Sequence, residues 1–139
     1  KDTFDLKYEV WKWCGYSEGK KSWNLYKNGV LVAGISNDNK NKFNVLIRHI
    51  ESKEKGMASK LIFMLLDNGV VLETGKPNYN SVSTTAYYMN KKIADLIRNN
   101  NKYMFTILGK ANNSGKEDYE PYKEASTKID NYHYRFELK

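Results

Sequence analysis

The sequence predicts an α+β fold that combines a mixed, mostly antiparallel sheet with two main helices, in the order ββββαβαββ. Four strand-like segments come in succession before residue 52. Residues 58–67 and 81–99 then carry apolar residues at helical spacing, and a short apolar run lies between them. Two further strand-like runs complete the pattern, and no internal repeat is found.

The first four strands are expected at residues 4–13, 22–26, 30–36 and 43–50. Residues 4–13 alternate apolar and charged side chains with period two, which is typical of a half-buried strand. Asn28 and Gly29 stand between two apolar runs, and both residues tolerate the positive φ that a tight hairpin turn requires. Short connections of this kind predict antiparallel neighbours.

The first helix is expected at residues 58–67, where Leu61, Ile62, Leu65 and Leu66 form an apolar stripe and Gly69 follows as a C-terminal cap. A buried strand is expected at residues 70–74, the second helix at 81–99, and the last two strands at 102–110 and 132–139. Residues 111–131 are polar and are expected to form a long loop.

The composition favours one soluble domain spanning residues 1–139. The chain is 40% hydrophobic and has no apolar run of the roughly 20 residues that a membrane helix needs. Cys14 is the only cysteine, which excludes an internal disulfide and fits a reducing compartment, so the cytoplasm is expected. His49 and His133 are far apart and have no metal-ligand spacing, so no metal is predicted.

A formal net charge of +7 favours contact with polyanions, and a basic module that binds nucleic acid or an acidic partner is one interpretation. Tryptophans and tyrosines could then stack on bases, although Trp11 and Trp13 are also spaced to share one sheet face. Only three of the cations are arginine, the residue that dominates bidentate phosphate recognition. A solvated lysine-rich surface is therefore the favoured interpretation of the charge.

The stretch from Arg48 to Gly69 passes from a strand, through charged residues, into the first helix. Gly56 lies between Lys53 and Lys55 just before that helix. A helix N-terminus presents unpaired amides and a positive dipole end, so this turn could bind a phosphate. The alternative is that Gly56 only permits a turn.

Two short motifs in this strand order resemble the GNAT superfamily of acetyl-coenzyme A dependent N-acetyltransferases. The family has Arg or Gln, two residues, Gly, one residue and then Gly or Ala, and here "KEKGMA" supplies Lys53, Gly56 and Ala58. The family's Asn with a small residue three on and a Tyr seven on is matched by Asn80, Ser83 and Tyr87. Lys53 keeps the cation of the family's arginine without its planar donor geometry. The family's helices between the first two strands are replaced here by a short connection.

The resemblance implies that acetyl-coenzyme A is the cosubstrate, with its pyrophosphate on the turn at residues 53–59 and its pantetheine along the edge of the fourth strand. The cofactor-binding residues that it implies are Ile50, Glu51, Ser52, Lys53, Glu54, Lys55, Gly56, Met57, Ala58, Ser59, Asn80 and Ser83.

The resemblance also implies a tyrosine that protonates the departing thiolate, and Tyr87 or Tyr88 on the second helix fits that role. With eleven tyrosines in the chain, either could instead be a core or surface residue. The candidate bases are Glu51 and His49, which period-two alternation places on one face, and Glu73 on the fifth strand. Solvated strand-end charges are the alternative.

The expected function is therefore transfer of an acetyl group to a primary amine, carried by a small molecule or by a lysine of a peptide or protein. The alternative is a GNAT-like or basic binding module without catalysis. The loop at residues 111–131 is expected to line the acceptor side and to attract cationic amines through four acidic residues, Glu117, Asp118, Glu120 and Glu124.

Overall fold

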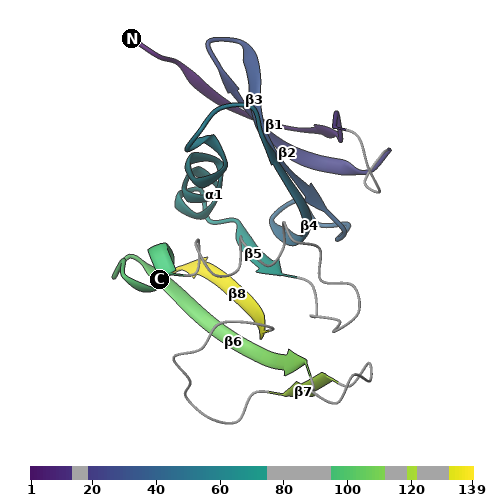
Figure 1. Ribbon diagram of the computed structural model, residues 1–139, viewed down its shortest axis with the longest axis vertical. Helices are drawn as coiled ribbons and strands as arrows, with labels where there is room; N and C mark the ends of the chain where they lie inside the picture. Colours follow the sequence, from purple (N-terminus) through teal and green to yellow (C-terminus); the bar gives the residue numbers. More distant parts are fainter. Residues whose placement is uncertain (14–18, 75–94, 112–118, 122–131) are drawn as a thin grey trace.

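The computed structural model describes residues 1–13, 19–74, 95–111, 119–121 and 132–139. The described strands join one sheet in the order β1-β2-β3-β4-β5-β8-β6-β7 (Figure 1). The strands are β1 Phe4–Val10, β2 Lys21–Lys27, β3 Val30–Asn37, β4 Asn44–Ser52, β5 Val71–Thr74, β6 Tyr103–Ala111, β7 Tyr119–Pro121 and β8 Tyr132–Leu138, and the helix α1 is Met57–Asp67.

The predicted α+β class is confirmed. Every neighbouring pair of strands is antiparallel except β4 and β5, which are parallel. Residues 95–98 are helical, and the rest of the second helix predicted at 81–99 lies outside the described residues. The short strand β7 falls inside the segment expected to be a loop, because its pairing with β6 is a long-range contact that a local pattern does not reveal.

The hairpin between β2 and β3 turns at Asn28 and Gly29, with φ values of 52° and 79°, as the sequence predicts. The first strand is shorter than expected and ends at Val10, so the prediction that it reaches residue 13 is wrong. Trp11 and Trp13 therefore do not share a sheet face as members of β1. The alternation changes phase at this point, because Val10 and Trp11 are both apolar, and the register with β2 ends at Val10 and Lys21.

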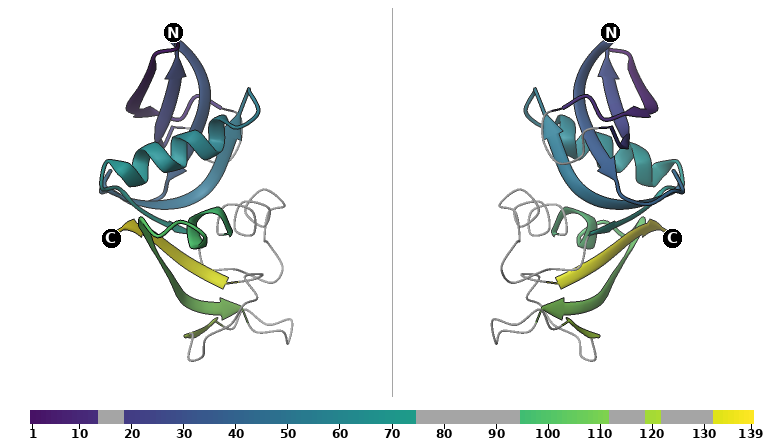
Figure 2. Two further views of the ribbon diagram at one scale, coloured as in Figure 1. Left: turned by 90° about the vertical axis from the view of Figure 1, so that its left-hand side faces the viewer. Right: turned by 90° about the vertical axis from the view of Figure 1, so that its right-hand side faces the viewer.

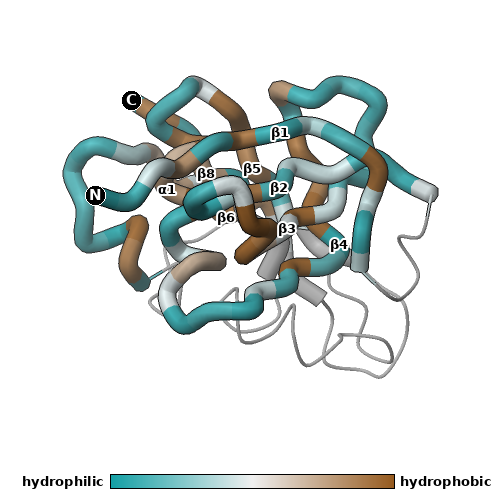
Figure 3. The backbone as a smooth tube through the Cα atoms, turned by 90° about the horizontal axis from the view of Figure 1, so that it is seen from above, coloured by the Kyte–Doolittle hydropathy of each residue, from teal (hydrophilic) through white to brown (hydrophobic). Residues whose placement is uncertain are grey.

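The helix α1 packs on one face of the sheet, as the two views in Figure 2 show. Its stripe is buried: Leu61 and Leu65 are 0% exposed, and Ile62 and Leu66 belong to the same core. Hydrophobic stretches of the chain, drawn brown in Figure 3, run through β3 and β5, whereas the N-terminal segment is hydrophilic. Burial of this apolar surface is the main force that holds helix and sheet together.

The C-terminus of α1 ends as the sequence predicts. Gly69 has a φ of 81°, and its amide donates to the Leu66 carbonyl at 3.0 Å. The amide of Val70 donates to the Leu65 carbonyl at 3.0 Å, and the Val70 side chain is buried. These two bonds satisfy carbonyls that the helix itself leaves open, and they direct the chain into β5.

One polar contact joins the end of α1 to β6. The Tyr103 hydroxyl donates to Asp67 Oδ1 at 2.6 Å, and Lys102 Nζ lies 2.8 Å from the same oxygen. The hydrogen bond from Lys102, with that from Tyr103, lowers the pKa of Asp67. Burial and the Asp67 contact raise the pKa of Tyr103 to about 12.

Replacing Tyr103 by Phe should lower the free energy of unfolding by about 1 kcal/mol at pH 7, because a hydrogen bond to a carboxylate is lost while the ring packing is kept. A raised pKa means that the folded state favours the neutral phenol. The wild-type advantage should therefore be full below about pH 10 and disappear as the pH rises towards 12. Denaturant unfolding of both proteins at several pH values measures it, and equal stability at pH 7 would contradict it.

Candidate functional site

The described pairing of β4 with β5 covers all of β5 and only the first part of β4. Their register runs from Asn44 with Val71 to Ile47 with Thr74, and β4 continues beyond this through residues 48–52. A bulge in β4 coincides with the end of the pairing, since Ile35 and Asn37 of β3 face Ile50 and Ile47. Bulges bend a strand and increase its twist, and in Figure 2 β4 curves away from β8 and β6.

The far part of β4 leads directly into the turn before α1. Gly56 caps the helix N-terminus in the left-handed region, with φ 85° and ψ −10°. This conformation by itself accounts for a glycine, whether or not a ligand binds. A Cβ built on Gly56 would meet nothing within 4 Å among the described atoms, so the space beside the turn is open.

The N-terminus of α1 has no side-chain cap and no acidic residue in its first turn. The Met57 amide donates to the Glu54 carbonyl at 3.2 Å, whereas the described residues provide no such acceptor for the amides of Ala58 and Ser59. Helix N-termini are normally capped by an oxygen. The two amides and the helix dipole therefore remain available to an anion.

Lysines surround this turn. Lys53 Nζ lies 5.3 Å from the ring centre of Trp13, and Lys55 is exposed. The carboxylate of Glu54 lies 2.8 Å from Lys27 Nζ, so its charge is balanced by a neighbouring cation. The turn is consequently positive overall.

The predicted cofactor residues from Ile50 to Ser59 are contiguous, but their side chains have different surroundings. Ile50 is 9% exposed and belongs to the core, so only its backbone can contribute to a site. Met57 and Ala58 pack against the same core and also contribute through backbone amides. The side chains of residues 51–55 are exposed, and Asn80, Ser83, Tyr87 and Tyr88 lie outside the described residues.

His49 and Glu51 lie on the sheet face opposite α1, since Ile50 between them faces the core. The His49 amide donates to Ser36 Oγ at 2.9 Å, and the imidazole lies 6.3 Å from the Trp11 ring, centre to centre. Glu51 is exposed and pairs in register with Gly34. The structure thus brings the two predicted bases together at the free end of β4.

Trp11 and Trp13 cover this face, a role that the sequence did not indicate. Their ring centres are 6.3 Å apart. A Cβ on Gly34 would lie 2.4 Å from Trp13 Nε1 and 2.7 Å from Asn24 Oδ1, so glycine allows the indole to lie directly on β3. The sequence did contain one feature that could have indicated this contact: Gly34 lies within an apolar strand, and a glycine there often marks the close approach of another group.

Replacing Gly34 by Ala should displace Trp13 and lower the free energy of unfolding by about 1–3 kcal/mol, the usual cost of overpacking. Tryptophan fluorescence and thermal melting measure the two effects. In a Trp13→Ala background the same substitution should cost less, because one of the two clashing groups is gone. An equal cost in both backgrounds would show that Trp13 does not lie on Gly34.

A polar layer under the tryptophans joins β1 to β2. Glu9 accepts hydrogen bonds from Asn24 Nδ2 at 2.8 Å and from the Tyr26 hydroxyl, and Lys12 Nζ lies 3.4 Å away. Burial alone would raise the pKa of Glu9, but these hydrogen bonds and the Lys12 charge outweigh it and lower that pKa. The buried hydroxyl of Ser22 donates to Asn24 Oδ1 at 3.1 Å. The layer fixes the strand that precedes the tryptophans.

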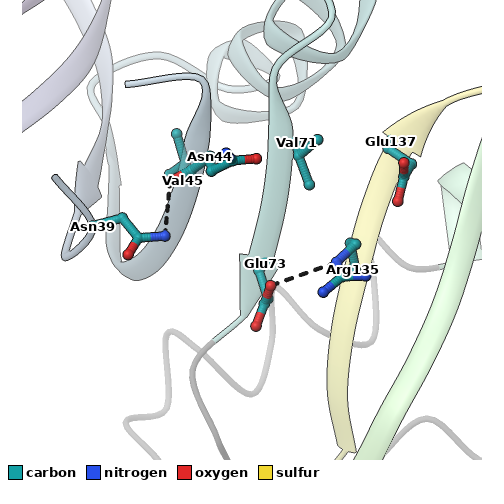
Figure 4. A pocket seen from close by; sticks show the side chains of 7 residues that line it. All are labelled: Asn39, Asn44, Val45, Val71, Glu73, Arg135 and Glu137. Carbon is teal, nitrogen blue, oxygen red and sulfur yellow. Dashed lines mark hydrogen bonds and ion pairs between the residues drawn. The ribbon is translucent and has the colours of Figure 1, made fainter. Parts of the chain in front are cut away.

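A cavity of about 430 Å³ lies over β4, β5 and β8. Figure 4 shows Glu73 and Arg135 facing one another across β5 and β8, with Arg135 Nε 3.6 Å from Glu73 Oε2. The cavity is lined by Asn39, Asn44, Val45, Val71, Glu73, Arg135 and Glu137. Glu73, a predicted base, therefore lies in a cavity next to the last paired residues of β4 and β5.

The described residues contain no group of three or more His, Cys, Asp or Glu side chains that could hold a metal ion. None of the described helices combines the length and apolar character needed to cross a membrane.

Comparisons of the chain with protein-family models, curated protein sequences and solved structures gave no match. The resemblance to the GNAT superfamily therefore depends on the motifs, and its functional consequences are proposals.

Proposed function

We propose that this protein is a GNAT-type N-acetyltransferase that moves an acetyl group from acetyl-coenzyme A to a primary amine. The observation that carries the proposal is that the described pairing of β4 with β5 ends at the β4 bulge, and that β4 then leads through a short turn into a helix N-terminus without a side-chain cap. A strand segment whose described pairing is with β3 alone and two amides without a described acceptor are thus close together in the chain. This combination suits a ligand with an amide-bearing arm and a phosphate group.

Each part of the cosubstrate has a matching group in this proposal. The amides of the pantetheine arm would pair with the backbone of residues 48–52, as an added strand does. The pyrophosphate would accept from the amides of Ala58 and Ser59, with Lys53 or Lys55 adding positive charge. The open space beside Gly56 lets a phosphate approach the backbone.

The chemistry requires a neutral amine near the point where the strands separate. The amine nitrogen attacks the acetyl carbonyl, the C–N bond forms, the C–S bond breaks, and its electron pair goes to sulfur. Glu73 on β5, or His49 and Glu51 on β4, would take the proton of the amine, directly or through water. Tyr87 or Tyr88 would protonate the thiolate, as the resemblance implies.

Replacing Ser59 by Glu provides a sharp test of the phosphate site. Glu at the third residue of α1 complements the helix dipole, so the thermal stability of the free protein should stay equal or rise slightly. The added negative charge should weaken binding of acetyl-coenzyme A about tenfold or more through repulsion. Calorimetry measures the affinity, and Ser59→Gln is the neutral control. Gly56 is less suitable because any side chain is strained at its positive φ.

The wild-type protein should be stabilised by about 2.7 kcal/mol when acetyl-coenzyme A is present at about 100 times its Kd. Absence of any thermal shift with the cosubstrate, together with a salt-dependent shift with oligonucleotides, would contradict the acetyltransferase and favour the basic binding module. Equal affinity for Ser59→Glu and Ser59→Gln would place the pyrophosphate elsewhere.

The proposed acid, Tyr87 or Tyr88, can be tested by removing its phenol hydroxyl. Tyr87→Phe keeps the ring and removes the transferable proton, so turnover should fall about 100-fold while cosubstrate affinity is nearly preserved. The Tyr88→Phe variant is the matched comparison, since the two tyrosines are adjacent. Steady-state release of free thiol measures turnover. If neither variant is slower than wild type, no tyrosine of this pair is the acid.

A further inference from the structure

The cavity over β4, β5 and β8 combines opposite charges with an apolar surface. Glu73 and Glu137 contribute carboxylates, Arg135 contributes a guanidinium, and Val71 lies on the same face of β5 as Glu73. The lining therefore carries one net negative charge within a protein of net charge +7. A cation is repelled by the positive charge of the whole molecule, but the negative charge of the cavity lining attracts it locally.

The positions of Glu73 and Glu137 on the two strands set the separation between the carboxylates that a ligand would have to span. Arg135 pairs with Glu73 and Phe136 with Leu72, so Glu137 is the next residue on β8 and lies beside Val71. Glu73 and Glu137 are thus offset by about two residues along the strands, about 6.6 Å, and by one strand spacing of about 4.8 Å, which places their Cα atoms about 8 Å apart. A chain of four or five methylenes with a nitrogen at each end has a comparable length, and its carbons could lie on Val71.

The cavity is also close to the point where acetyl transfer would take place. Glu73 pairs in register with Leu46, and the described pairing of β4 with β5 ends one residue later, at Ile47 and Thr74. The side chain of Glu73 projects on the face opposite α1, because Leu72 and Thr74 on either side of it are buried. Glu137 lies on the same face, farther from the strand separation (Figure 4).

We propose that this cavity is the acceptor site for an aliphatic amine that carries a second polar nitrogen, with Glu137 binding the distal ammonium and Glu73 receiving the reactive amine. Arg135 holds Glu73 in position through their ion pair. This inference rests on the proposed acetyltransferase function, and it adds the substrate class and the residue that selects it. A free diamine and the lysine side chain of a peptide share this chemistry in part, and the experiment distinguishes them.

The test compares three probes in a thiol-release assay with saturating acetyl-coenzyme A: pentane-1,5-diamine, an N-acetylated lysine amide, and glutamate as an acidic amine. The diamine should have the lowest KM if the distal site binds an ammonium. A lower KM for the lysine amide, whose second nitrogen is uncharged, would contradict an ammonium site at Glu137 and would favour peptide lysine as the acceptor. Glutamate should be the poorest acceptor, because its side-chain carboxylate would face Glu137.

The decisive variant is Glu137→Gln, which keeps the shape and removes the charge. It should raise the KM of the diamine about tenfold with little change in kcat, because a charge-assisted contact to the bound substrate is lost. Asp5→Asn is the matched control, since Asp5 is exposed on β1 and loses the same charge outside the cavity. That control should leave KM unchanged.

Binding to the wild-type protein gives an independent measurement that requires no substitution. In NMR titration, pentane-1,5-diamine should shift the backbone amides of Val71, Glu73 and Glu137 and leave those of α1 unchanged. If Glu137→Gln keeps the wild-type KM, or if the diamine shifts no amide of the cavity, the acceptor-site inference is overturned while cosubstrate binding still supports the proposed function. If acetyl-coenzyme A itself fails to bind, the proposed function and the acceptor assignment are both overturned.

Discussion

The bulge in β4 is the constraint on which the candidate site depends. Before it, β4 pairs with β3 on one side and with β5 on the other, so both edges of the strand are hydrogen-bonded. After it, the described pairing continues only with β3, from Ile50 to Ser52. A single extra residue thus bends β4 without breaking its pairing to β3, and the described pairing to β5 ends at the same point. A strand edge is a natural template for another chain, which is why the proposed pantetheine site lies on this part of β4.

The helix α1 gives that edge a defined end. Its C-terminus is fixed by the turn at Gly69 and by the buried stripe that packs on the sheet. Its N-terminus, in contrast, has neither a side-chain cap nor an acidic residue. The free energy that keeps α1 in place thus comes from its apolar face and its far end, which leaves the amides near Gly56 open to a ligand. The strand β4 is divided in a similar way: its first part pairs with both β3 and β5, and the described pairing of its last part is with β3 alone.

The face opposite α1 divides into two chemically different areas. Towards β1, Trp13 lies on Gly34 of β3, and Glu9 accepts a hydrogen bond from Asn24 beside that contact. Towards β8, the cavity carries Glu73, Arg135 and Glu137. His49 and Glu51 lie between these areas, on the free end of β4. Groups that could remove a proton are thus present on both β4 and β5 near their last described pair, and Trp11 and Trp13 lie on the β1 side of them.

The sequence by itself determined the local structure. Apolar periodicity located α1 and most strands, Asn28 and Gly29 fixed a hairpin, and Gly69 ended the helix, because these features depend on side-chain period and on the φ that each residue tolerates. The proposed phosphate-binding turn is predicted from Gly56 and its flanking lysines at the start of a helix, and the rest of the candidate set from Ile50 to Ser59 comes from the family resemblance.

Only the tertiary structure decided where strands stop pairing and which distant residues meet. The end of β1 at Val10, the bulge of β4 and the strand β7 follow from register with neighbouring strands, and register is a long-range property. The contact of Trp13 with Gly34 joins residues that are far apart in the sequence. The cavity that brings Glu73 together with Arg135 and Glu137 depends on the insertion of β8 between β5 and β6. No local pattern encodes those distances, since residues far apart in sequence become neighbours only when the whole core is buried.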